Sequence, residues 1–291
     1  MTPAAAIPAA EPFRAACIQL TSDRDPEKTY PAAADLVREA AAAGASLVMT
    51  PEVTPMLEPR GRLVLEKVRP EAADEWLPRY RALARETGAW LLLGSMAVRV
   101  DAERCANRSL LIDPGGSVVA RYDKIHMFDV DLEGGESYRE SRRYRPGGAA
   151  VVADTPFGSI GMTVCYDMRF PALYRDLAQA GADYLTVPSA FARPTGRAHW
   201  HVLLRARAIE TGCFVFAPAQ CGEHAEGRKT FGHSLIVDPW GEVLADGGEE
   251  PGVVMAEIDP ARIGEARRMV PSLGHDRPYT PPGKLREYAA D

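Results

Sequence analysis

Short apolar runs alternate along this chain with longer alanine- and leucine-rich stretches that have helical spacing. In the N-terminal third, the runs predict strands at 13–20, 46–50 and 90–94, and the longer stretches predict helices at 27–43 and 71–87. Gly44 and Gly88 directly follow the two helical stretches, as is common at a helix C-terminus. This order of strand and helix predicts βαβ units with parallel strand pairing.

The rest of the chain adds β-hairpins between further strands and helices. Hairpins are predicted at 109–120, 149–164 and 234–244, helices at 171–180 and 198–211, and strands at 184–187 and 214–216. Proline and glycine at the centre of the hairpins supply the dihedral angles of a tight turn. Both halves combine βα units with a hairpin, and no charged or low-complexity linker divides them. We expect an α/β fold in which two sheets pack face to face with helices outside.

Composition agrees with one folded domain of ordinary globular type. The chain of 291 residues is long enough for a substantial core, and hydrophobic and charged residues make up 46% and 25% of it. We place the domain at 13–278. It follows a short disordered lead-in (1–12) rich in alanine and proline, and it precedes a C-terminal tail (279–291).

Charge and cysteine usage narrow the range of partners. The net charge of −6 argues against nucleic acid, and no apolar stretch approaches the roughly 18 residues needed to cross a bilayer. The first ten residues lack a basic segment followed by an apolar block, which argues against a secretory signal. Five scattered cysteines without a CxxC pair suggest neither a disulfide framework nor a zinc site. We expect a cytoplasmic protein without nucleic-acid or membrane partners and without a metal.

Cys165 carries the strongest chemical signal in the sequence. It ends the apolar run 159–164, and an alanine- and leucine-rich helical stretch begins at Pro171. A thiol that faces a helix N-terminus feels the positive end of the backbone dipole, which lowers the thiol pKa and favours the thiolate. The position therefore suits a nucleophile.

Two other residues follow predicted strands of their own and suit acyl transfer by such a thiol. Glu52 follows the run 46–50, and Lys124 lies just beyond the hairpin strand that ends at 120. Hydrolysis of an amide or nitrile needs a base for the thiol and then for water, and Glu52 can serve. It also needs a cation or an N–H group to stabilise the oxyanion, and Lys124 and the backbone N–H of Tyr166 can serve.

Taken one at a time, each of these residues has a commoner structural explanation. A cysteine in a buried strand is usually inert, a glutamate after Thr-Pro is usually a turn residue, and a lysine beside Tyr-Asp is usually an exposed edge residue. A Cys–His hydrolase is a further alternative, because the chain has six histidines, but no spacing selects one of them. The residues alone leave these interpretations open.

Three segments, 49–52, 122–130 and 164–171, resemble the signature segments of the nitrilase superfamily of carbon–nitrogen hydrolases and occur in the same order. The similarity covers about 13–277, nearly the whole chain. It implies a four-layer αββα sandwich of two mixed β-sheets and hydrolysis through a cysteine thioester, with no metal or organic cofactor.

The resemblance also implies roles for particular residues. It assigns Glu52, Lys124 and Cys165 as the catalytic triad, and it assigns Glu140 to position the substrate and to keep Lys124 charged. Without it, Glu140 would be read as one of several solvated charges in a polar loop. A homo-oligomer, a dimer or higher, is implied as well.

Within the superfamily, the chain is most similar to the branch that contains deaminated glutathione amidase and ω-amidase, through segments at 188–191, 195–210 and 232–241. Arg197, where these enzymes usually carry proline, and the segment 53–56 depart from that branch and leave the acyl group open. The residues expected to bind substrate are Phe128, Tyr166, Arg169, Phe191 and Thr195.

Arg169 bears on the choice of substrate, because it follows the nucleophile by about one helical turn. Its guanidinium could bind a carboxylate through two hydrogen bonds, which favours an acidic ω-amide over a bare nitrile. A structural salt bridge, to Asp167 or Asp176, is the alternative.

The expected function is a cofactor-independent amidase that hydrolyses the terminal amide of a small carboxylate substrate to acid and ammonia. Deaminated glutathione and α-ketoglutaramate are the substrates that the resemblance implies. An N-carbamoyl amino acid amidohydrolase or a nitrilase with the same triad is one alternative. A non-catalytic oligomeric scaffold is an alternative of another class.

Overall fold

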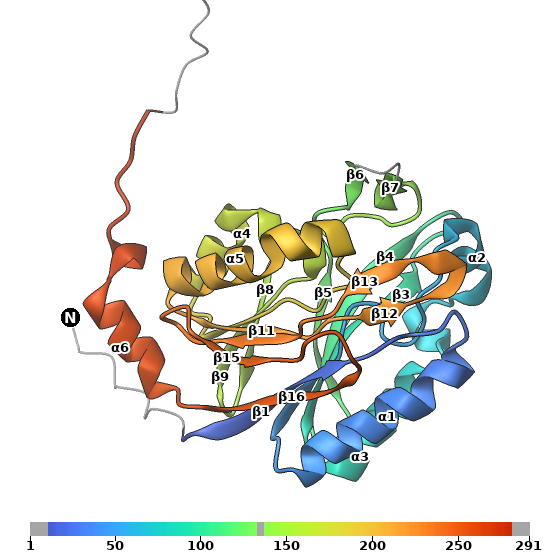
Figure 1. The fold of residues 1–291 in the computed structure, drawn as a ribbon, viewed down its shortest axis with the longest axis horizontal. Coiled ribbons are helices and arrows are strands. Elements are labelled where there is room, and N and C mark those ends of the chain that lie inside the picture. The colour runs from blue at the N-terminus through green and yellow to red at the C-terminus, as the bar shows by residue number, and fades with distance from the viewer. Residues whose placement is uncertain (1–10, 133–136, 281–291) are drawn as a thin grey trace, which may run out of the picture.

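Two mixed six-stranded sheets form the centre of the molecule, and helices cover their outer faces (Figure 1). The computed structural model describes residues 11–132 and 137–280. Most of the expected lead-in (1–12) and tail (279–291) therefore lies outside the described residues. The αββα sandwich that the sequence predicts is confirmed.

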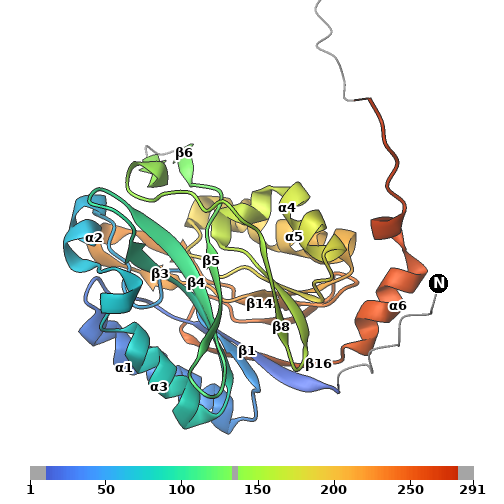
Figure 2. The same ribbon diagram turned by 180° about the vertical axis from the view of Figure 1, so that it is seen from behind.

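The first sheet joins the N-terminal half of the chain to one strand from its C-terminal end. Its order is β16 (Gly252–Ile258), β1 (Phe13–Gln19), β2 (Leu47–Met49), β3 (Trp90–Arg99), β4 (Cys105–Ile112), β5 (Val118–Asp123). Strands β1, β2 and β3 run parallel, and the outer strands join antiparallel. Helices α1 (Pro26–Ala42) and α3 (Leu77–Thr87) lie side by side on the outer face, as the view from behind also shows (Figure 2).

The second sheet repeats this plan with the remaining strands. Its order is β15 (Val243–Asp246), β14 (Leu235–Val237), β11 (Phe214–Ala217), β10 (Tyr184–Thr186), β9 (Gly158–Met162), β8 (Val151–Thr155). Strands β9, β10 and β11 run parallel, and the others join antiparallel. Helices α4 (Pro171–Gln179) and α5 (Arg193–Thr211) cover its outer face (Figure 1).

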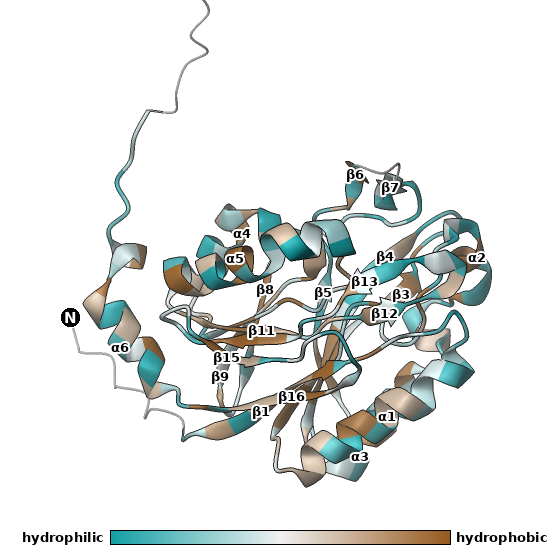
Figure 3. Cartoon of the chain, viewed as in Figure 1, coloured by the Kyte–Doolittle hydropathy of each residue, from teal (hydrophilic) through white to brown (hydrophobic). Residues whose placement is uncertain are grey.

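The central strands are apolar on both faces, because each sheet is covered on both sides. Successive side chains of β1 show this: Cys17 packs in the core between the sheets, and Ile18 packs in the core beneath α1 and α3. Hydrophobic residues accordingly concentrate along the strands (Figure 3). The sheet-to-sheet core holds the ends of β2, β5 and β9 in fixed relative positions, and the candidate residues follow those ends.

Some elements differ from the sequence-based prediction. The helix expected at 71–87 is a single 3-10 turn (Glu71–Ala73) followed by α3, because the Asp74 carboxylate accepts hydrogen bonds from the N–H groups of Trp76 and Leu77 and starts the helix there. Helix α5 begins five residues earlier than expected, with Pro194 in its first turn. Strand β3 extends to Arg99.

Other elements were not predicted at all. They are α2 (Gly61–Lys67), β6 (Asp129–Asp131), β7 (Ser137–Arg139), β12 (Cys221–Glu223), β13 (Lys229–Phe231), β16 and α6 (Ala261–Met269). Most are short and polar, so they lack the apolar periodicity on which the prediction depends. Among the described helices, none has the length and apolar character that a bilayer span requires.

Candidate active site

Cys165 stands at a strained turn between β9 and α4. It is the first residue of a 3-10 helix (Cys165–Arg169) and has a φ of +50°, in the left-handed region that non-glycine residues seldom adopt. Its N–H donates a 3.0 Å hydrogen bond to the carbonyl of Pro188, which follows β10. The turn presents the side chain to a cavity, and the surrounding structure maintains the strain, as is common at functional sites.

Glu52 reaches the same cavity from the end of β2. Its Oε2 accepts a 2.8 Å hydrogen bond from the N–H of Ala190, and its Oε1 accepts one of 2.8 Å from Asn107. Gly94 permits the close approach of β3 here, because a Cβ at that position would lie 1.9 Å from the carbonyl oxygen of Thr50. The hydrogen bonds from Ala190 and Asn107 orient both carboxylate oxygens of Glu52 before any substrate binds.

Lys124 directly follows β5 and carries an ammonium group that is almost fully buried. Its Nζ lies 3.0 Å from Glu52 Oε1 and 2.8 Å from Glu140 Oε2, and its side chain is 2% exposed. Burial alone would lower the pKa of the amine, but the Glu140 and Glu52 carboxylates outweigh burial and hold the pKa well above its usual value. The side chain therefore remains an ammonium ion.

Glu140 completes this group from the 3-10 turn (Glu140–Arg142) that follows β7. In addition to Lys124, its carboxylate accepts a 2.7 Å hydrogen bond from the N–H of Phe128 and one of 3.3 Å from Asn107. The structure thus brings the four residues predicted as catalytic to the wall of one cavity: Glu52, Lys124, Glu140 and Cys165.

The protonation of the resting site differs from the sequence-based expectation. Burial, together with the neighbouring Glu52 carboxylate, raises the pKa of the Cys165 thiol, although Lys124 opposes the shift. Burial also raises the pKa of Glu52, but Lys124 and hydrogen bonds, including one from Cys165, bring it below its usual value. This direction is opposite to the thiolate expected from a helix dipole, because the 3-10 turn (Cys165–Arg169) separates the sulfur from the start of α4 and the Glu52 carboxylate lies beside the sulfur.

The cavity has a volume of about 220 Å³, and charged, aromatic and small apolar side chains line it. Of the residues predicted to bind substrate, Phe128, Tyr166, Phe191 and Thr195 line it. The ring centroids of Phe128 and Tyr166 are 5.2 Å apart in an edge-on arrangement. These residues would enclose a small substrate near the sulfur.

Arg169 is not among the residues that line the cavity. Its guanidinium lies over the rings of Tyr166 and Phe191, 5.8 and 5.5 Å from their centroids, and its Nη2 lies 3.2 Å from His199 Nδ1. Among the described residues, Arg169 makes no salt bridge to Asp167 or Asp176 either; Asp167 bonds to Tyr122 and His126.

Three residues of the site were not predicted from the sequence. Asn107 in β4 is buried and bridges Glu52 and Glu140, and Asp167 fixes the turn of Cys165 by accepting a 2.9 Å hydrogen bond from the N–H of Val164. Arg228 lines the cavity, and its Nη2 donates a 3.2 Å hydrogen bond to the carbonyl of Ala190. A polar Asn inside an apolar strand was the one available signal for Asn107; nothing in the spacing marked the others.

No histidine is among the residues that line this cavity, which leaves the Cys–His alternative without support in the described part of the chain. His126 bonds to Asp167, and His224 is buried between the carbonyl of Ser22 and the hydroxyl of Thr230. These histidines have structural partners.

Comparisons with known proteins agree with this geometry. Residues 14–268 match the carbon-nitrogen hydrolase family. The chain is 45% identical over 272 residues to a deaminated glutathione amidase from Homo sapiens, covering 92% of this chain and 83% of the relative. The crystal structure of the NitFhit protein from Caenorhabditis elegans superposes with a TM-score of 0.87 and 38% identity, over 92% of this chain and 66% of that one.

A further solved structure bears on the cysteine. A variant of an amidase from Nesterenkonia sp., 27% identical with a TM-score of 0.76 over 89% of this chain and 98% of that one, is described with acrylamide added at its active-site cysteine. The match of sequence and fold confirms the resemblance to the nitrilase superfamily. The chain belongs to the carbon–nitrogen hydrolase family and is a cysteine-dependent amidase.

Proposed function

We propose that this amidase hydrolyses the terminal amide of a small substrate that also carries a carboxylate, with Cys165, Glu52 and Lys124 as its catalytic triad. The observation that carries the proposal is the convergence of a thiol, a carboxylate and an ammonium group at one cavity wall. The relatives named deaminated glutathione amidase support a substrate of that kind.

The first half-reaction begins with a proton transfer from the Cys165 thiol to Glu52, to which it is hydrogen-bonded. The sulfur attacks the amide carbon, and the carbonyl electron pair moves to oxygen. The Lys124 ammonium and the N–H of Tyr166 stabilise this oxyanion. When the tetrahedral intermediate collapses, the C–N bond breaks, the nitrogen takes the proton from Glu52, and ammonia leaves a thioester on Cys165.

The second half-reaction uses the same groups with water as the nucleophile. Glu52 takes a proton from water, the hydroxide adds to the thioester carbonyl, and the C–S bond breaks to give the acid. The proton held by Glu52 then returns to the sulfur. Glu140 acts by holding Lys124 in place and charged, since its carboxylate shares the ammonium with Glu52.

Substrate recognition needs a cation at the cavity wall in addition to Lys124. Arg228 lines the cavity, its Nη2 donates a hydrogen bond to the carbonyl of Ala190, and its guanidinium lies 5.7 Å from the ring centroid of Tyr138. We assign the substrate carboxylate first to Arg228. Arg169, behind Tyr166 and Phe191, remains a second candidate that would need to turn inward.

We also propose that the protein forms a homo-oligomer. Apolar side chains stand exposed along the outer face of α5 and beside it: Val202, Ile209 and Trp240. Exposed residues of this kind on a helix face are typical of a subunit interface. Sedimentation equilibrium would test it, and a monomer at micromolar concentration would contradict it.

The function is tested by an ammonia-release screen across ω-amides with and without a carboxylate, 2-oxo-amides, N-carbamoyl amino acids and nitriles. We expect turnover of acidic ω-amides. Carbon dioxide released together with ammonia would favour the N-carbamoyl alternative. No turnover of any class would favour a scaffold. Intact-mass measurement during turnover should show an acyl adduct on the wild type and none on Cys165→Ala.

A further inference from the structure

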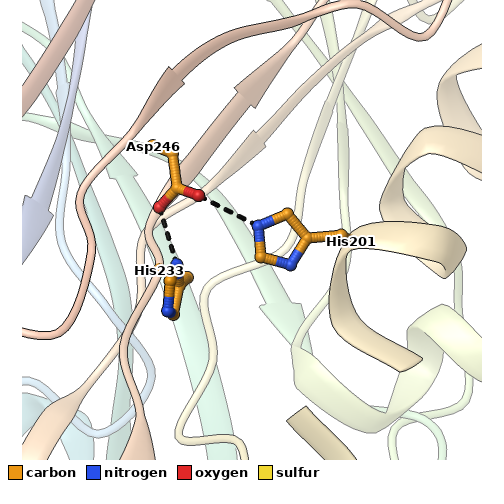
Figure 4. Close-up of side chains that lie close together, drawn as sticks. All are labelled: His201, His233 and Asp246. Atoms are coloured by element: carbon orange, nitrogen blue, oxygen red, sulfur yellow. Dashed lines mark hydrogen bonds and ion pairs between the residues drawn. The ribbon is translucent and has the colours of Figure 1, made fainter. Parts of the chain in front are cut away.

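Away from the cavity, three side chains able to bind a metal converge at the edge of the second sheet (Figure 4). His201 lies on α5, His233 precedes β14, and Asp246 ends β15. Asp246 Oδ2 lies 3.0 Å from His201 Nε2, and Asp246 Oδ1 lies 2.8 Å from His233 Nδ1. The three ligand atoms all lie within 4.8 Å of one another.

His233 is held in place by its backbone and by its ring. Its φ is +55°, its N–H donates a 2.6 Å hydrogen bond to the carbonyl of Gly248, and its carbonyl accepts one of 2.7 Å from Trp200 Nε1. The ring of Phe231 stacks on the imidazole with centroids 4.5 Å apart. The imidazole is thus fixed by contacts that do not involve the other two side chains of the cluster.

The other two members are anchored as well. His201 follows Trp200, which is fully buried and so sets the rotation of α5 at this point. The Asp246 carboxylate accepts a further hydrogen bond of 2.9 Å from the N–H of Gly248. The side chains are about one-fifth to two-fifths exposed, so an ion can reach them from solvent.

We propose that His201, His233 and Asp246 bind a divalent transition-metal ion such as Zn²⁺, with water as the fourth ligand. Two imidazole nitrogens and one carboxylate oxygen form a donor set that zinc favours, with bonds of about 2.0–2.2 Å. Tetrahedral bonds of that length separate neighbouring ligand atoms by about 3.3 Å. The two contacts to Asp246, 3.0 and 2.8 Å, lie within about half an ångström of that separation. They involve different carboxylate oxygens, so binding through one oxygen requires the carboxylate to turn and the ligand atoms, which lie within 4.8 Å of one another, to close around the ion.

Binding replaces the hydrogen bonds of the cluster with metal bonds. The protons on the ring nitrogens that face Asp246 pass to solvent or to the opposite ring nitrogen, and no redox step is involved. One ligand lies in α5, one lies just before β14, and one ends β15. The ion would therefore link the outer helix to the sheet edge. The sequence predicted no metal site, since the histidines lie 45 and 13 residues from Asp246 and match no ligand motif.

The test is a Zn²⁺ titration of the full chain, monitored by isothermal titration calorimetry. The protein carries no histidine tag and is first treated with a chelator, which is then removed. We expect one saturable site, weakened at least about tenfold in His201→Gln and in Asp246→Asn. His199→Gln is the matched control, because His199 lies on the same helix but contacts Arg169. Cys165→Ala should also retain the site, which separates it from thiol binding.

Two further measurements use the same variants. Zn²⁺ should raise the melting temperature of the wild type and leave that of His201→Gln unchanged, because an ion that binds only the folded state stabilises it. Co²⁺ should give the intense visible absorption of a four-coordinate ion in the wild type only. Absence of saturable Zn²⁺ binding by the wild type, or equal affinity in His201→Gln and Asp246→Asn, would overturn the proposal and leave a hydrogen-bonded His–Asp–His cluster.

Discussion

The carboxylate of Asp167 accepts a 2.7 Å hydrogen bond from the hydroxyl of Tyr122. This contact crosses from one sheet to the other, because Tyr122 lies in β5 and Asp167 lies in the turn that follows β9. The same carboxylate also binds the N–H groups of Val164 and His126. It therefore fixes the turn that carries Cys165 against the strand that ends at Lys124.

Tyr122→Phe tests this link between the sheets. The substitution removes one partner of a buried carboxylate, so we expect a loss of about 1–3 kcal/mol in the free energy of unfolding, together with a lower kcat. Urea unfolding and steady-state kinetics measure the two effects. Tyr30→Phe is a matched control, since its hydroxyl makes an exposed 3.3 Å contact. Equal effects of both substitutions would contradict the role of Tyr122.

Glu52→Gln should separate thiol ionisation from catalysis. Burial and then the Glu52 carboxylate raise the pKa of Cys165, and Lys124 lowers it, so removing the carboxylate charge should lower the thiol pKa. We expect the pH profile of iodoacetamide alkylation to move to lower pH, while kcat falls by about 10²–10⁴ because the base is lost. An unchanged pH profile of alkylation would show that Glu52 does not raise the thiol pKa of Cys165.

Arg228→Gln tests the carboxylate contact. We expect KM for acidic ω-amides to rise about tenfold or more while KM for neutral amides stays unchanged, since a charge-assisted hydrogen bond is worth about 1.5–3 kcal/mol. Arg169→Gln serves as the comparison, because Arg169 lies behind the aromatic wall. A KM effect confined to Arg169→Gln would reverse the assignment of the two arginines.

His224 should make folding stability depend on pH. Burial, the largest cause, lowers its pKa from 6.5 to about 4. The unfolded chain therefore takes up a proton more readily than the folded one, and the stability present above about pH 6.5 is lost as the pH falls toward 4. We expect about 2 kcal/mol of this loss between pH 7 and pH 5.

Urea unfolding at the two pH values measures the contribution of His224. The difference between pH 7 and pH 5 should shrink by that amount in His224→Gln. It should persist in His275→Gln, whose side chain is exposed. An equal pH dependence in the wild type and His224→Gln would show that another group is responsible.

The sequence predicted the sheets and the principal residues because their signals are local. Apolar runs gave the central strands, and the segments around Glu52, Lys124 and Cys165 could be matched to a family without knowing the fold. Asn107 could not be assigned in this way, because its role arises from two carboxylates that reach it from β2 and from the turn after β7.

The sequence could not predict the direction of the Cys165 pKa shift for a related reason. It depends on how deeply the sulfur is buried and on which carboxylate stands beside it, and both are properties of the assembled site. Arg169 was placed one turn after the nucleophile by counting along a helix. The turn is 3-10 in geometry and ends at that residue, so its side chain leaves toward α5 instead of the cavity.

The left-handed backbone at Cys165 bears on which residues could replace the proposed nucleophile. A β-branched side chain is far more strained than an unbranched one at a φ of +50°. Serine can therefore occupy the position with less backbone strain than threonine. Val53, which also has a φ of +50°, shows that the fold holds a β-branched residue in this conformation elsewhere. The backbone at this turn thus favours an unbranched residue at position 165.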